Sequence, residues 1–240
     1  MNIQSQSQRY SQMSETFINA IFLTLSGGFQ DAYTYCCRGE VFANAQTGNI
    51  VRMSLNLFEG NWGGALRYLV PIFAFISGIY CAELLRRRLK DMAVIHWRQI
   101  ILLLEICLLF FVGFMPFSWD YIANAVVSFV CALQVHSFRK IGESIYASTM
   151  CIGNLRSATE LLCSYVHTKE KTTLKRSMEY FGVLLFFAIG AGIGGILTDI
   201  LGKYAIWLSC LLLAVSFCLM FLKEDVEEIK EDLEALEAKH

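Results

Sequence analysis

Apolar segments long enough to cross a lipid bilayer constrain this chain more than any other feature. A bilayer core of ~30 Å requires about 20 apolar residues in a helix. The chain of 240 residues is 55% hydrophobic and 17% charged, whereas soluble domains carry about 25% charged residues. Because lipid offers the backbone no hydrogen-bond partners, we expect an all-α polytopic membrane protein. The sequence predicts six transmembrane helices, at 16–37, 66–87, 99–117, 119–138, 179–201 and 204–222.

The distribution of Lys and Arg predicts how these helices are oriented, because cytoplasmic loops are enriched in both residues. The links between the second and third helices and between the fourth and fifth contain twelve of them, whereas the opposite side has Arg38, Arg52, Arg67 and Lys203. Both termini are therefore predicted in the cytoplasm. Residues 1–15 lack the pattern of a cleaved signal peptide and are expected to remain as a cytoplasmic tail.

Two polar stretches that contain Gly-Asn indicate an internal repeat. They follow the first and fourth helices, and with two one-residue gaps they align at Gly48-Asn49 and Gly153-Asn154. Downstream, FAFISGI in the first half matches FAIGAGI in the second. Each half then contains three predicted membrane helices, and because three is odd the halves have opposite orientations. The sequence predicts one membrane domain, 16–222, of two inverted repeats, about 16–117 and 119–222, as is common in secondary transporters.

The Gly-Asn stretches suggest re-entrant segments with short helices. We expect Gly48 and Gly153 to permit a close approach that a side chain would block, and Asn49 and Asn154 to cap the helices that follow. Helix N-termini facing a shared cavity would present partial positive charge to an anionic or polar solute. The alternative is that both stretches only brace the fold.

The first half carries a recognisable motif. Gly27-Gly28 and Asp31-Ala32, followed by Gln46-Thr47-Gly48-Asn49, resemble the signature of the YoaK-type family, bacterial six-helix membrane proteins classed as a domain of unknown function. The second half departs from it, with Ile152 where Thr is expected. The resemblance implies a multi-pass protein of the bacterial inner (cytoplasmic) membrane and implies no established substrate.

Ionisable residues inside predicted membrane helices are functional candidates because they are costly there. Asp31 is either a proton, cation or amine site or a structural carboxylate bonded to backbone N–H groups of the Gly-Asn segment. His136 is either interfacial or part of the site, and Glu105 either pairs with an Arg or ionises in a cavity. The candidate cavity-lining residues are Asp31, Gln46, Thr47, Gly48, Asn49, Gly153, Asn154, His136 and Glu105.

Small residues predict where helices approach closely. Gly190 and Gly194 form a GxxxG face on the fifth helix, and Ala74 with Gly78 forms a small face on the second. We expect the second and fifth helices to pack against each other through these faces. A sliding surface for alternating access is the alternative.

The sequence favours a secondary transporter or channel for a small solute, with the lipid bilayer as its surroundings. A non-transporting scaffold or regulator is the alternative, supported by the acidic segment 223–240, read either as a solvated helix or as a short coiled coil that assists a homo-oligomer. A membrane enzyme is the weakest reading, because no nucleophile–base pair or metal-ligand spacing stands out. We expect no enzymatic activity, no cofactor or metal, and, with a net charge of -1, no nucleic-acid partner.

Overall fold

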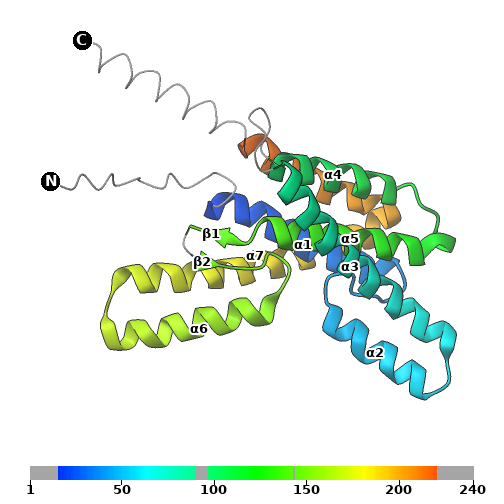
Figure 1. Cartoon of the computed structure of the whole chain (residues 1–240), viewed down its shortest axis with the longest axis horizontal. Coiled ribbons are helices and arrows are strands. Elements are labelled where there is room, and N and C mark those ends of the chain that lie inside the picture. The colour runs from blue at the N-terminus through cyan, green and yellow to red at the C-terminus, as the bar shows by residue number, and fades with distance from the viewer. Residues whose placement is uncertain (1–15, 90–96, 143, 221–240) are drawn as a thin grey trace, which may run out of the picture.

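The computed structural model describes residues 16–89, 97–142 and 144–220, which form a helical bundle (Figure 1). The predicted tail 1–15 and the acidic segment 223–240 lie outside the described residues. A helix over 206–220 follows α7, and a short antiparallel pair of strands precedes α6. The elements are α1 (Phe17–Cys37), α2 (Gln46–Phe58), α3 (Trp62–Leu89), α4 (Trp97–Val112), η2 (Phe117–Trp119), α5 (Asp120–Ser137), β1 (Lys140–Ile141), β2 (Ser144–Ile145), α6 (Cys151–Thr168), α7 (Lys171–Leu201) and η3 (Gly202–Ala205).

The helical class and the helix positions agree with the sequence. Each of the six predicted segments coincides with a helix, and the two Gly-Asn stretches contain the beginnings of α2 and α6. Among the described residues, α3 and the run Lys171–Met220 are long and apolar enough to cross a membrane. Helix α1 is more polar because Asn19, Ser26 and Gln30 lie on it, and the protein interior buries all three.

The helices pack in pairs of distant sequence. Helix α1 lies along α7, and α3 lies along α5. Helix α2 packs on α3, and α6 packs on α7, so that each short helix forms a hairpin with the longer helix that follows it. In Figure 1 the two short helices begin near the middle of the molecule and diverge toward different ends.

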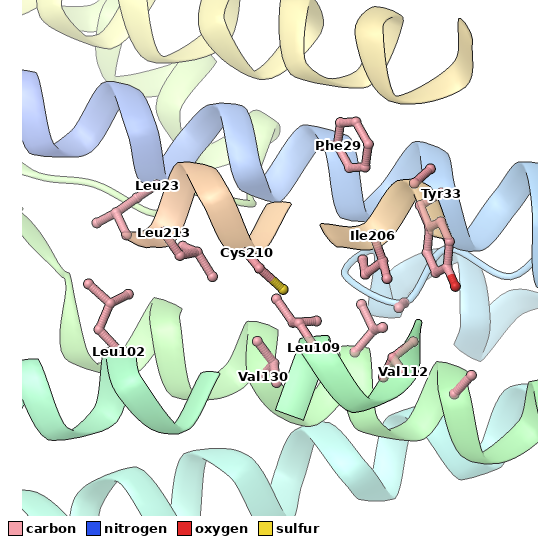
Figure 2. Close-up of a cluster of buried hydrophobic side chains, with 14 of the residues drawn as sticks. Leu23, Phe29, Tyr33, Leu102, Leu109, Val112, Val130, Ile206, Cys210 and Leu213 are labelled. Atoms are coloured by element: carbon pink, nitrogen blue, oxygen red, sulfur yellow. The ribbon is translucent and has the colours of Figure 1, made fainter. Parts of the chain in front are cut away.

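A hydrophobic core joins α1, α4, α5 and 206–220 (Figure 2). Leu102 and Leu109 of α4 lie on the buried face of that helix, and Leu213 of 206–220 and Leu23 of α1 belong to the same cluster. Full burial of a Leu side chain contributes about 1.5–3 kcal/mol when its surface leaves water, whereas between membrane helices close packing and interhelical hydrogen bonds supply the attraction. For helices in a membrane, the close contact between α1 and α7 therefore says more about what holds the helices together than the burial of these leucines does.

The prediction that the second and fifth membrane helices, here α3 and α7, pack against each other is wrong, because each packs against a different helix. Gly190 and Gly194 of α7 lie against α1, where a Cβ on Gly190 would overlap the carbonyl oxygen of Leu25 and one on Gly194 would lie 2.9 Å from the Cα of Phe29. Gly78 of α3 lies against α5, 2.6 Å from the carbonyl oxygen of Phe129 when a Cβ is added. Small residues mark a close contact, but their spacing does not identify the helix on the other side.

We expect Gly190→Ala to destabilise the protein by about 1–3 kcal/mol, because the added methyl group meets a backbone carbonyl that cannot rotate away. Thermal or detergent-induced unfolding of the purified protein measures this loss. Gly192→Ala is the matched control on the same helix, since a Cβ there meets no atom within 4 Å; it should be neutral or stabilising by up to about 1 kcal/mol. Equal effects of the two substitutions would contradict the contact.

Candidate functional site

The chain returns into the bundle after α1. Helix α1 ends at Cys37, and Gly39 (φ +83°) and Glu40 (φ 59°) turn the backbone through left-handed conformations. The Asn44 backbone N–H then donates to Asp31 Oδ1 at 2.9 Å, and its side-chain Nδ2 donates to the carbonyl of Gly27 at 3.0 Å. Gly27 lies ten residues before the end of α1, about 15 Å along the helix axis. Segment 38–45 therefore runs back to the middle of α1.

Helix α2 begins at this depth. The Gln46 Nε2 donates to the carbonyl of Ala43 at 2.7 Å and to Ser128 Oγ at 2.8 Å, and Ser128 lies in the middle of α5. Ser128 in turn donates to the carbonyl of Pro71 on α3 at 2.8 Å. The first turn of α2 is therefore fixed to two other helices inside the bundle.

The loop of the second half returns to the same level from the other side. Gln134 Nε2 on α5 donates to Ser148 Oγ at 2.6 Å and to the carbonyl of Leu23 on α1 at 3.1 Å. Thr149 Oγ1 lies 3.3 Å from Cys131 Sγ. A Cβ on Gly27 would lie 2.7 Å from Thr149 Cγ2, so the second loop lies against the residue whose carbonyl anchors the first. The segments that lead into α2 and α6 thus converge at Gly27.

Asn49 and Asn154 have equivalent roles, but not the predicted one. Ala45 and Met150 occupy the N-cap positions, and neither side chain makes a capping bond. Each Asn lies in the first turn and donates back to the carbonyl seven residues earlier, Asn49 to Phe42 at 2.9 Å and Asn154 to Ala147 at 2.7 Å. The capping prediction is wrong because the helices begin four residues earlier than the sequence suggested, which places both amides where they hold the preceding loop.

The predicted close approach at the two glycines is also wrong. Neither Gly48 nor Gly153 has a positive φ, and an added Cβ would meet no atom within 4 Å at either position. Both lie on the exposed side of their helices, as does Thr47. The loop geometry depends instead on Gly27, where a Cβ would meet Thr149, and on Gly39, whose positive φ and contact with the Arg67 guanidinium disfavour a side chain.

The structure separates the ionisable candidates. Asp31 accepts the Asn44 N–H and so adopts the geometry of the structural alternative, at the point where the two loops meet. Glu105 is fully buried on α4 and has no Arg partner among the described residues. His136 lies in the last turn of α5, where its Nε2 is 3.0 Å from Glu83 Oε2, in a cluster with Arg86 and Arg87. Gln134, two residues earlier, faces the second loop instead.

Arg38 is a buried residue that sequence reasoning counted only as a loop cation. Its side chain is 0% exposed, and its guanidinium donates to five acceptors, which are Tyr33 OH, Asp120 Oδ1 and the carbonyls of Val112, Met115 and Pro116. Arg38 therefore ties the end of α1 to the turn between α4 and α5. Its only signal in the sequence is its place directly after an apolar segment.

Polar side chains also join α1 to 206–220. Ser26 Oγ and Ser209 Oγ lie 2.7 Å apart, and Gln30 Nε2 donates to both. About two helical turns toward the N-terminus of α1, Ser216 Oγ donates to Asn19 Oδ1 at 2.5 Å. Buried polar pairs of this kind hold helices together where no water is available.

We expect Asn49→Ala and Asn154→Ala each to lower stability by about 1–3 kcal/mol, because each leaves a loop carbonyl without its donor. Unfolding of the purified variants measures the loss. Thr47→Ala, an exposed position in the same turn as Asn49, should change stability by no more than about 0.5 kcal/mol. A loss at Thr47 as large as that at Asn49 would contradict a specific anchoring role.

Arg38→Lys should destabilise the protein by about 3 kcal/mol, since one ammonium group cannot reach five acceptors arranged around a planar fork. The same unfolding measurement applies. Arg52→Lys is the matched control, because Arg52 is exposed and makes a single long bond of 3.5 Å to Tyr68 OH. An Arg38→Lys variant as stable as this control would show that the five bonds contribute little.

Comparison with known proteins identifies a family. A family model described as "Protein of unknown function (DUF1275)" matches residues 19–219, which include all the elements of the site. No curated protein and no solved structure matches this chain.

Proposed function

This chain belongs to the DUF1275 family of proteins of unknown function, and from its geometry we propose that it is a secondary transporter or channel for a small solute. In this proposal α1, α3 and α4 form one repeat of three membrane helices, and α5, α7 and 206–220 form a second, inverted repeat. The protein crosses a bacterial inner membrane with both termini in the cytoplasm. The proposed site lies between the repeats, around Gly27, and is assigned no catalytic residue.

The packing supports a twofold relation between the halves. Exchanging the halves turns the α1–α7 pair into the α5–α3 pair, and the α2–α3 hairpin into the α6–α7 hairpin, and all four pairs occur. It also turns the α4–α5 contact into the contact of 206–220 with α1, which the Ser26–Ser209 and Asn19–Ser216 bonds provide. Asn49 and Asn154 add an equivalent bond in each half.

The helix directions support the same arrangement. Helices α1 and α7 run parallel, because Gly190 faces Leu25 and Gly194 faces Phe29. Helix 206–220 runs antiparallel to α1, because Ser209 pairs with Ser26 and Ser216 with Asn19. A chain that crosses the membrane six times, with α2 and α6 not crossing, requires both relations.

Exposed apolar side chains support the membrane setting. On α3 and α7 large hydrophobic residues face outward, including Phe73, Ile76, Ile193, Ile196 and Ile200. Many outward apolar side chains on helices long enough to span a bilayer are suited to lipid rather than to water.

The observation that carries the proposal is the convergence of both returning loops on Gly27. Because of it, α2 and α6 direct their N-termini into the middle of the bundle from opposite sides. A helix N-terminus carries about half a positive charge, and paired half-helices of this kind bind anionic groups in transporters. The solute class that fits is a small molecule with an anionic or strongly polar group.

Thiol labelling tests whether water reaches this level. In a background without the nine native cysteines, we expect Thr47→Cys and Gly153→Cys to react with a membrane-impermeant thiol reagent, each from one side of the membrane. Both positions are exposed in the structure although their helices begin at mid-bundle. Ile76→Cys, exposed on the middle of α3, is the control for a lipid-facing position and should not react.

Protection of both site cysteines to the same extent as Ile76→Cys would contradict a solute pathway. The Gly-Asn segments would then act as braces, and the scaffold function would gain support. Labelling that a bound solute slows, in a screen of small anionic and polar metabolites, would identify the solute for flux measurements.

A further inference from the structure

Glu105 is a buried acid that none of the contacts above accounts for. It lies on the buried face of α4, one turn from Leu102 and one turn from Leu109, both of which are labelled in Figure 2. The residue is 0% exposed, and neither carboxyl oxygen has a hydrogen-bond partner among the described residues. It lies about 12 Å along α4 from Trp97, well inside the helix.

The surroundings of Glu105 favour the neutral acid. A carboxylate buried without donors is far more costly than a neutral carboxylic acid, so such a group takes up a proton. Arg38 shows the contrast within the same protein, because that buried ion has an acidic partner and four further acceptors. Among the described residues nothing comparable compensates a charge on Glu105.

Polar groups connect the level of Glu105 with the proposed site. Cys131 of α5 follows Val130, which belongs to the same core cluster as Leu102 and Leu109, and its Sγ lies 3.3 Å from Thr149 Oγ1 of the second loop. On the other side, Cys210 Sγ donates to the carbonyl of Ile106, the residue after Glu105. Ser209, next to Cys210, is bonded to Gln30, whose Oε1 is a further buried acceptor without a described partner.

Other titratable groups lie on the elements packed against α4. They include Cys131 and His136 on α5, Cys210 on 206–220, and Cys81 and Glu83 on α3. Glu83 is bonded to Arg86, Arg87 and His136 at the end of α3 and is therefore held as a carboxylate. The three cysteines are free thiols.

We propose that Glu105 is a reversible proton-binding site, neutral at rest, and that its proton exchanges with water through the polar groups around Cys131 and Asp31. When Glu105 releases its proton it becomes a carboxylate, and uptake of a proton from the other side restores the acid. The consequence, that solute movement is coupled to H⁺, rests on the proposed function. The ligand of the site is the proton itself.

Infrared spectroscopy of the purified protein tests the protonation directly. At pH 7 we expect wild type to show a carboxylic-acid carbonyl band that Glu105→Gln lacks and that Asp31→Asn retains. Glu105→Gln replaces a neutral acid by a neutral amide of the same size, so it should fold normally. The band should shift in D₂O, which reports exchange with water, and disappear as the pH is raised.

The pH dependence of stability gives a second readout with a defined sign. Folded wild type keeps a proton that the unfolded chain releases above about pH 4.3. Raising the pH therefore favours unfolding, by up to tenfold in the folding equilibrium constant per pH unit, until Glu105 itself ionises. Glu105→Gln should lack this component, whereas Glu105→Asp should retain a titrating acid.

Two results would overturn the proposal. One is an infrared spectrum at pH 7 that is the same for wild type and Glu105→Gln, which would mean that Glu105 is ionised. The other is a band that neither titrates nor shifts in D₂O, which would mean a sealed structural acid. The site and the transport function fail separately: an exchanging band with protected Thr47→Cys and Gly153→Cys retains the proton site and rejects the pathway, and labelled cysteines without the band do the reverse.

Discussion

The bonds from Asn44 to Gly27 and Asp31 determine where the first Gly-Asn helix begins. A polar loop that follows the end of a helix has favourable partners in water, so its return into the bundle requires compensating bonds inside. Asn44 supplies two of them, and Gln46 extends the attachment to α5. The absence of a side chain on Gly27 then allows Thr149 to approach the same point of α1. One residue of α1 therefore sets the position of both short helices.

The two halves are alike in packing and different in chemistry. Gln30 and Gln134 occupy similar places in their halves, yet Gln30 bonds to 206–220 and Gln134 bonds to α1 and to the second loop. Asp31 has no acidic counterpart at the corresponding level of α5, and Arg38 ties only the first half to the central turn. Similar backbones thus carry unequal polar groups.

The sequence predicted the helices well because apolar length alone is enough to locate them. It also predicted that the two Gly-Asn stretches begin short helices and that Asp31 lies near the first of them. It failed where the answer depended on a partner that spacing does not reveal. The GxxxG face of α7 meets α1 rather than α3, and Asn49 and Asn154 anchor loops instead of capping helices. The buried state of Arg38 follows only from the fold around it.

Helix α1 packs against α7 and 206–220, the last of the described helices to be synthesised, so its partners are made long after it is. Asn19, Ser26 and Gln30 enter early, but Ser209 and Ser216 are made almost 200 residues later. At 5–20 residues per second this interval is roughly 10–40 s. In the membrane setting proposed above, a buried polar group that faces lipid instead costs several kcal/mol. In that setting α1 would have to stay near water until its C-terminal partners are made, and the fold would close only when translation is nearly complete.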